Sequence, residues 1–338
     1  MEPYKALALQ TTCHAVNALA PQDARQQVLN NIAKIEQQIA ASKRFIGPDL
    51  RLVVLPEYFA TGFPMGESFP LWQEKACFHV QGPEYAALAE IAKQQNIFLS
   101  GNAYELDPHF PALYFQASFI FAPTGEMVLR YRRLNSMFAP TPHDVWDRYV
   151  EIYGLDGVFP VAKTEIGNLA CIASEEILYP EIARCLMMRG AEVFLHATSE
   201  VGSPQMTQKG VAKLARAIEN MAYVVSANSA GIAGIDIPFA STDGLSKIIN
   251  NEGLVLCEAG YGESMVANAT IDIEALRKHR NRPAMSNFIA RQRFELFADS
   301  YQQAHFYPVN TFLNKSPDRQ DFTKNIQAGI QNYLNTQD

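Results

Sequence analysis

The sequence predicts an α/β fold in which helices cover mixed β-sheets, and two observations support this prediction. Short runs of β-branched and aromatic residues recur along the chain and alternate with segments of helical period. The last of these runs follow one another around a turn at residues 251–253, without a helix between them. Alternating strands and helices that end in hairpins are typical of mixed sheets sandwiched by helices.

The individual elements follow from these patterns. The best helical stripe consists of Val28, Ile32, Ile35 and Ile39, within a predicted helix at residues 23–42. Two more helices are predicted at residues 180–189 and 208–221. Strands are predicted at residues 4–9, 51–55, 97–104, 115–121, 127–131, 169–173, 192–196, 223–227, 245–249, 254–257 and 265–271.

No linker or change of composition divides the 338 residues. We therefore expect one domain at residues 1–285. Residues 286–338 lie beyond the predicted sheets and are rich in aromatic side chains. We expect this C-terminal extension to pack on the body of the protein or on a partner subunit.

Composition excludes several classes of protein. The net charge of -7 disfavours a nucleic-acid partner, which requires a basic surface. No run approaches the ~20 apolar residues of a membrane span, and no secretory signal is evident. The five cysteines are dispersed without a CxxC pair, so we expect reduced thiols in a cytoplasmic protein and no metal site.

Glu57 is the first candidate for chemistry. It follows a predicted buried strand, at the edge where α/β proteins place their sites. Partial desolvation there would suit a general base. Taken alone, a carboxylate that stabilises the start of a helix explains Glu57 better.

Arg133 is the second candidate, because it lies at the end of a predicted strand in the sequence GEMVLRYRRLN. A cation at this position could stabilise an oxyanion. An exposed basic strand end or a structural ion pair is the alternative.

Ser174 is the third candidate and lies between a predicted strand and a predicted helix. Pro180 opens this helix and Gly190 follows it, as expected for helix ends. A small nucleophile in a sharp strand-to-helix turn has the layout of a nucleophile elbow. Backbone N–H groups there can receive an oxyanion.

Together these blocks resemble the nitrilase, or carbon–nitrogen hydrolase, superfamily. The resemblance rests on Leu55-Pro56-Glu57, on Tyr131-Arg132-Arg133, and on Ser174 with Pro180-Glu181, Arg184 and Gly190-Ala191. Later blocks, RAIEN followed by YVVSAN and then Asp243-Gly244 with Gly253, extend it over roughly residues 5–275. It implies a four-layer αββα sandwich that assembles into homodimers or larger homo-oligomers. It also implies hydrolysis of a small amide, carbamoyl compound or nitrile, without a cofactor.

Two of the three catalytic positions depart from the superfamily pattern. The cysteine position holds Ser174, and the lysine position holds Arg133. Cys171 lies inside the predicted strand, so we expect it to be buried and inert. Arginine keeps the charge of lysine but is larger and planar and cannot give up a proton. A serine hydroxyl needs a nearby base to act as a nucleophile.

Further residues complete the predicted site. We expect Glu57, Arg133 and Ser174 to be catalytic, and Glu175 and His196 to contact the substrate. For His196 a satisfied structural histidine is the alternative, and the sequence taken alone favours it. A second acidic residue of the superfamily falls in the segment PTPHDVWDRYVE, where the candidates are Asp144, Asp147 and Glu151. The cavity walls are expected from loops at residues 59–69, 138–156 and 200–206.

Three hypotheses explain the departures. The chain could be an engineered cysteine-to-serine variant, which leaves Arg133 unexplained. It could be a natural amidase-like hydrolase with an atypical Glu57/Arg133/Ser174 site. It could also be a non-catalytic relative that binds a small ligand or acts in assembly. The sequence leaves open whether the protein is an active enzyme.

Overall fold

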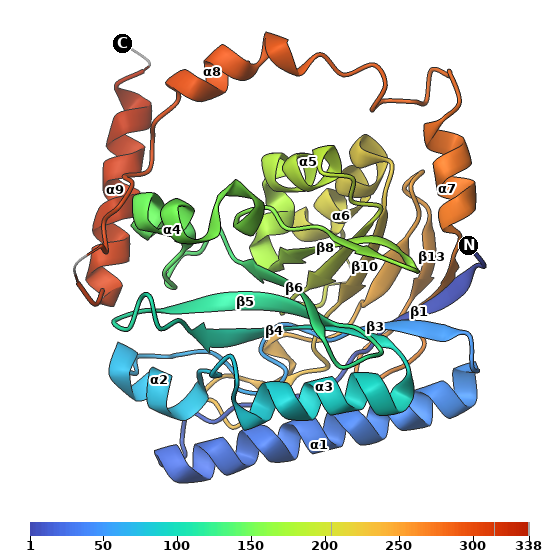
Figure 1. The fold of residues 1–338 in the computed structure, drawn as a ribbon. Helices are drawn as coiled ribbons and strands as arrows, with labels where there is room; N and C mark the ends of the chain where they lie inside the picture. Colours follow the sequence, from blue (N-terminus) through green and yellow to red (C-terminus); the bar gives the residue numbers. More distant parts are fainter. Residues whose placement is uncertain (204, 314, 337–338) are drawn as a thin grey trace.

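Two six-stranded mixed sheets lie face to face at the centre of the protein, and helices cover both outer faces (Figure 1). The structure is a computed structural model that describes residues 1–203, 205–313 and 315–336. Its layers follow the order helix, sheet, sheet, helix. The predicted four-layer αββα sandwich is therefore confirmed.

The first sheet combines parallel strands at its centre with antiparallel strands at its edges. Strands β1, β3 and β4 are parallel, while β14, β5 and β6 pair in antiparallel fashion. The order is β14 (Asn268–Ile271), β1 (Tyr4–Ala8), β3 (Leu50–Val54), β4 (Phe98–Leu106), β5 (Tyr114–Phe121) and β6 (Met127–Arg132).

The second sheet has the same plan, with parallel β8, β9 and β10 flanked by antiparallel neighbours. Its order is β13 (Val255–Glu258), β12 (Lys247–Ile249), β10 (Tyr223–Ala227), β9 (Val193–Ala197), β8 (Gly167–Ala173) and β7 (Ala162–Thr164). Two short strands, β2 (Cys13–His14) and β11 (Ile232–Ala233), form a separate parallel pair.

The period-two alternation of the strands divides the buried side chains into two cores. In β3, Leu52 and Val54 join the core between the two sheets. Val53 points the other way and joins the core beneath the helices, together with Ile32 and Ile35 of α1 (Pro21–Ile46). The predicted stripe on this helix is therefore its buried face.

The remaining helices cover the outer faces or extend from them. In Figure 1, α1 and α3 lie beneath the first sheet, and α5 and α6 lie above the second. These helices are α2 (Phe69–Ala76), α3 (Pro83–Gln95), α4 (Trp146–Tyr153), α5 (Pro180–Met188), α6 (Gln208–Asn220), α7 (Ile273–Arg280), α8 (Ala298–Gln303) and α9 (Arg319–Leu334). Short 3-10 helices are η1 (Pro142–Val145), η2 (Leu155–Gly157), η3 (Ser174–Leu178), η4 (Phe239–Ser241) and η5 (Phe294–Leu296). No helix in the described part of the chain is long and apolar enough to cross a membrane.

Some predicted boundaries were wrong near the end of the second sheet. The strand predicted at residues 245–249 begins at Lys247, because Leu245 has a φ of 64° and the N–H of Ser246 bonds to Gln10 Oε1. The strand predicted at 265–271 begins at Asn268 and joins the first sheet beside β1. The sequence patterns do not predict helices α2, α3, α4, α7, α8 and α9.

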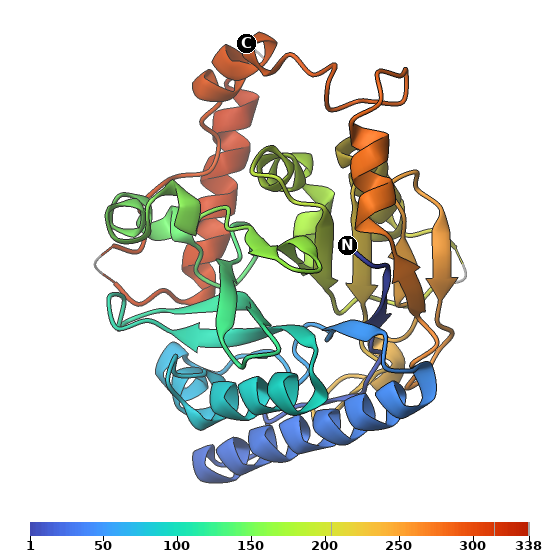
Figure 2. The same ribbon diagram turned by 45° about the vertical axis from the view of Figure 1, so that its right-hand side comes forward.

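The C-terminal extension arches over α5 and α6 from α7 to α9, as the two views agree (Figures 1 and 2). Its last part packs on the body, where Phe312 and Phe322 are buried. The middle of the arch is exposed: Leu296 and Tyr301 keep 68% and 61% of their surface.

Leu52→Ala tests the core between the sheets. The substitution removes a fully buried side chain, so we expect the free energy of unfolding to fall by about 2–5 kcal/mol. Urea unfolding followed by circular dichroism measures the change. Phe45→Ala is the control: Phe45 is 80% exposed, and its replacement should cost less than about 0.5 kcal/mol. Equal effects of the two substitutions would contradict the assigned core.

Candidate active site

Glu57, Arg133 and Ser174 line one cavity of about 330 Å³. Glu57 and Arg133 follow β3 and β6, which run in the same direction within the first sheet. Ser174 follows β8 of the second sheet. The other lining residues are Tyr58, Phe63, Pro64, Tyr104, Gln116, Ser136, Met137, Phe138, Ala139, Glu175, Ser199, Lys209 and Thr242. The volume suits a small ligand.

Ser174 occupies a strained turn. Its φ of 49° is in the left-handed region, which side chains other than glycine and asparagine rarely adopt. It directly follows β8 and begins the 3-10 helix η3. Such strain costs of order 1–3 kcal/mol and tends to gather at functional sites. The strand-to-helix elbow expected at Ser174 is therefore present.

A buried hydrogen-bond network fixes the carboxylate of Glu57. Glu57 is 1% exposed, and its Oε1 accepts from Gln116 Nε2 at 2.7 Å and from Arg133 Nη1 at 3.2 Å. Arg133 Nη1 also donates to Gln116 Oε1 at 2.6 Å. Burial opposes the charge of Arg133, yet Glu57 and its neighbours raise the arginine pKa above the ordinary value. The guanidinium therefore stays charged and holds Glu57 in place.

All three guanidinium nitrogens of Arg133 already have acceptors within the protein. Nη1 bonds to Glu57 and Gln116, Nη2 donates to Glu175 Oε1 at 2.5 Å, and Nε donates to the Asn135 carbonyl at 2.7 Å. An oxyanion would have to compete with two carboxylates for these donors. Arg133 is therefore better suited to organise the site than to bind the reacting oxygen.

Glu176 connects the turns that carry Arg133 and Ser174. Its carboxylate accepts from the Tyr131 hydroxyl at 2.7 Å and from the N–H groups of Leu134, Asn135 and Ala173 at 2.6, 3.0 and 3.2 Å. Burial raises the pKa of Glu176 to about 7, while Arg133 and these donors oppose the rise. The contacts bridge the two sheets at the cavity.

His196 contacts the backbone of Ser174 and does not line the cavity. It is fully buried, and its Nε2 lies 2.8 Å from the Ser174 carbonyl. Burial, aided by the charge of Lys213, lowers the pKa of His196 to about 3, so the ring is neutral. Nε2 then donates to the carbonyl, and Nδ1 accepts from the Ser226 hydroxyl at 2.9 Å. Both ring nitrogens therefore have partners within the protein, whereas Glu175 lines the cavity.

Lys209 is the site residue that the sequence did not reveal. Its Nζ lies 3.2 Å from Ser174 Oγ. Thr207 caps the start of α6 by accepting from Gly210 N, so Lys209 lies in the first helical turn. The predicted helix start was the available signal, but a lysine in a first helical turn gives no indication of what its side chain reaches.

None of the three acidic candidates in the segment PTPHDVWDRYVE lines the cavity. The carboxylate of Asp144 caps η1 through Thr141 and accepts from Thr311 of the C-terminal extension. Asp147 and Glu151 line a separate surface pocket. All three carboxylates therefore lie outside the cavity that Glu57 lines.

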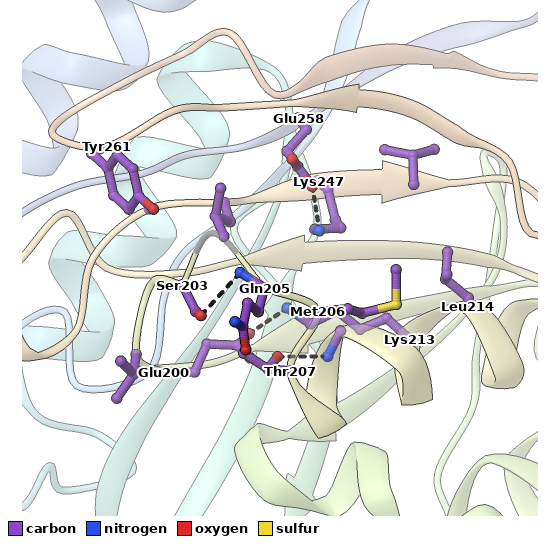
Figure 3. Close-up of a pocket in the computed structure, with 15 residues that line it drawn as sticks. Glu200, Ser203, Gln205, Met206, Thr207, Lys213, Leu214, Lys247, Glu258 and Tyr261 are labelled. Carbon is purple, nitrogen blue, oxygen red and sulfur yellow. Dashed lines mark hydrogen bonds and ion pairs between the residues drawn. The ribbon is translucent and has the colours of Figure 1, made fainter.

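A neighbouring cavity of about 340 Å³, drawn in Figure 3, is lined by residues of α6, β12, β13 and the segment after Ser199. Lys213 pairs with Glu200 and Lys247 with Glu258 along its wall. Of the loop predicted at residues 200–206, the residues that line a cavity line this one and not the site: Glu200, Val201, Ser203, Gln205 and Met206. The loops predicted at 59–69 and 138–156 do contribute, through Phe63, Pro64, Phe138 and Ala139.

The cysteines take no part in the site. All five are free thiols, and Cys171 is fully buried in β8, 3.7 Å from Ser100 Oγ. Burial raises the pKa of the Cys171 thiol to about 12. Within residues 1–203, 205–313 and 315–336, no group of three or more His, Cys, Asp or Glu side chains is arranged to hold a metal ion.

Comparison with known proteins identifies relatives of the chain. The sequence profile of a family described as carbon-nitrogen hydrolase matches residues 15–281. Formamidases of Bacillus thuringiensis and Bacillus cereus are each 28% identical, over 68% and 70% of this chain. The match spans 66% of the length of each formamidase, slightly less than two thirds.

Solved structures share the fold. A carbon-nitrogen hydrolase from Helicobacter pylori superposes with a TM-score of 0.65 at 17% identity, covering 90% of this chain and all of the other. A Saccharomyces cerevisiae member of branch 10 of the nitrilase superfamily gives 0.64 at 18%, covering 86% and 97%. An amidase from Nesterenkonia sp. AN1 gives 0.62 at 18%, covering 88% and 96%; fluoroacetamide adds its acetamide moiety to the active site cysteine of that enzyme.

His196→Gln tests the buried neutral histidine. The unfolded chain takes up a proton on His196 below a pKa of about 6.5, while the folded chain does so only near 3. Wild-type stability should therefore fall as the pH drops through this window. Glutamine does not titrate, so between pH 7 and pH 5 the wild type should lose about 2 kcal/mol more unfolding free energy than the variant. Denaturant unfolding of both proteins at pH 7 and pH 5 measures this loss. If the free energies of unfolding of wild type and variant differ by the same amount at both pH values, His196 is not a buried neutral histidine.

Proposed function

This chain belongs to the carbon-nitrogen hydrolase family of the nitrilase superfamily, and we propose that it hydrolyses a small non-peptide amide at Ser174. The observation that carries the proposal is the strained Ser174, which faces the same cavity as the buried Glu57. The formamidase relatives support a short amide as the substrate. The volume of about 330 Å³ agrees with that size.

In the proposed reaction, Ser174 Oγ attacks the amide carbon and forms an acyl ester as ammonia leaves. Water then hydrolyses the ester and restores the serine. Glu57 holds the amide nitrogen and takes the proton of the hydrolytic water. Arg133 keeps the carboxylates of Glu57 and Glu175 in position, in keeping with its four hydrogen bonds.

Ammonia release from formamide and acetamide tests the proposal. Ser174→Ala should abolish release, because it removes the attacking oxygen. Glu57→Gln should slow release by about 10²–10⁴-fold, the usual contribution of a general acid–base group. Ser174→Cys should preserve or raise activity, since a thiol is the stronger nucleophile at neutral pH.

Cys171→Ala is the matched control for the nucleophile, because Cys171 lies three residues from Ser174 but is buried. It should leave turnover within a few-fold of the wild type. Activity that survives Ser174→Ala would exclude the assigned site. A wild type that releases no ammonia, yet melts at higher temperature with acetamide, would favour the non-catalytic binding alternative.

The exposed arch suggests how the protein assembles, and we propose that a second copy of the chain covers it. Leu296 and Phe297 expose 68% and 49% of their surface, although both are apolar. In light scattering, the double variant with Leu296→Ser and Phe297→Ser should have the mass of a monomer, 37.6 kDa. The wild type should have a multiple of that mass. A monomeric wild type would contradict the proposal.

A further inference from the structure

We propose that Lys209 takes the hydroxyl proton of Ser174, so that the two side chains form a serine–lysine dyad. The inference rests on the proposed function, because it supplies the base that a serine nucleophile needs. Among the described residues, Lys209 Nζ is the group within hydrogen-bond distance of Ser174 Oγ, at 3.2 Å. Both side chains face the cavity that Glu57 also lines.

The other polar groups near Ser174 are poorly suited to this step. Arg133 has no lone pair with which to accept a proton. His196 uses Nε2 to donate to the Ser174 carbonyl and is buried behind the serine. Glu57 Oε1 already accepts two hydrogen bonds, one of them from Arg133. A carboxylate is also a far weaker base than a neutral amine.

The structure holds Lys209 against Ser174 through the packing of α6 on η3. Arg216 of α6 donates from Nε to the Ile177 carbonyl of η3 at 2.9 Å, and Arg216 is 7% exposed. This bond fixes the helix that carries Lys209 to the turn that carries Ser174. The next lysine along the helix, Lys213, pairs with Glu200. In the described part of the chain, Lys209 forms no such ion pair.

The chemistry balances without a further reagent. The neutral Lys209 amine takes the Ser174 proton as the Oγ–carbon bond forms and the carbonyl oxygen becomes an oxyanion. When the oxyanion collapses, the carbon–nitrogen bond breaks and the Lys209 ammonium returns the proton to the leaving nitrogen, which departs as ammonia. Serine–lysine pairs are an established variant of serine catalysis on unrelated folds.

Reaction with phenylmethanesulfonyl fluoride tests the dyad without a substrate. Ser174 Oγ bonds to sulfur, fluoride leaves and Lys209 takes the proton, so intact mass spectrometry follows the labelling rate. Lys209→Met and Lys209→Arg should both be at least ~100-fold slower, the scale of a lost general base. Ser174→Ala should remain unlabelled.

Two controls separate the dyad from a general effect of charge. Lys209→Arg keeps the positive charge but cannot give up a proton. Lys247→Met removes a nearby cation that lines the neighbouring cavity and pairs with Glu258, so it should keep the wild-type rate (Figure 3).

Ethylamine in solution should partly restore labelling of Lys209→Ala, because a free amine replaces the missing base.

The outcomes distinguish this inference from the proposed function. A wild-type labelling rate in Lys209→Arg, or a wild type that is not labelled at Ser174, would overturn the dyad. Amide hydrolysis that needs Ser174 but survives Lys209→Met would also overturn it, while leaving the proposed function intact. Labelling that depends on Lys209 in a protein that hydrolyses no amide would support the dyad and reject the amidase.

Discussion

The site depends on one buried carboxylate, that of Glu176. The cavity is formed where the two sheets meet, with Arg133 contributed by the first and Ser174 by the second. Glu176 follows Ser174 in η3 and accepts hydrogen bonds from Tyr131, Leu134 and Asn135, on the side of Arg133. A buried acceptor with several donors fixes both turns, because leaving any of those donors unpaired costs free energy. The relative placement of Ser174 and the Glu57–Arg133 pair follows from these hydrogen bonds of Glu176.

The two departures from the superfamily pattern that we infer from the sequence can be understood together. Arg133, which the resemblance aligns with the lysine position, is held by Glu57, Gln116 and Glu175, so its charge lies against carboxylates. An amine next to Ser174 comes instead from the first turn of α6. In the dyad that we propose, a weaker nucleophile is combined with a nearer base. A hydroxyl needs such a base more than a thiol does.

Sequence patterns predicted the fold well because the spacing of apolar residues follows from which side chains are buried. The alternation in β3 and the stripe on α1 each reflect which side chains face a core. The elbow at Ser174 was also predictable, since strand, proline and glycine positions frame it. The contacts of Lys209 and His196 with Ser174 were not predictable, because both depend on how α6 and β9 pack against η3. Contacts between elements distant in sequence leave no local periodicity.

The arrangement around Ser174 also bears on whether the cavity is used. Its left-handed φ and the burial of the Glu57 carboxylate each oppose folding on their own. They persist because Glu176, Arg133 and Arg216 hold the surrounding turns through buried hydrogen bonds. A purely structural strand end would be stable with an unstrained residue and an apolar filling in place of the polar cavity. The strained serine, the fixed carboxylate and the amine therefore make chemistry at Ser174 the simplest physical explanation for the shape of this site.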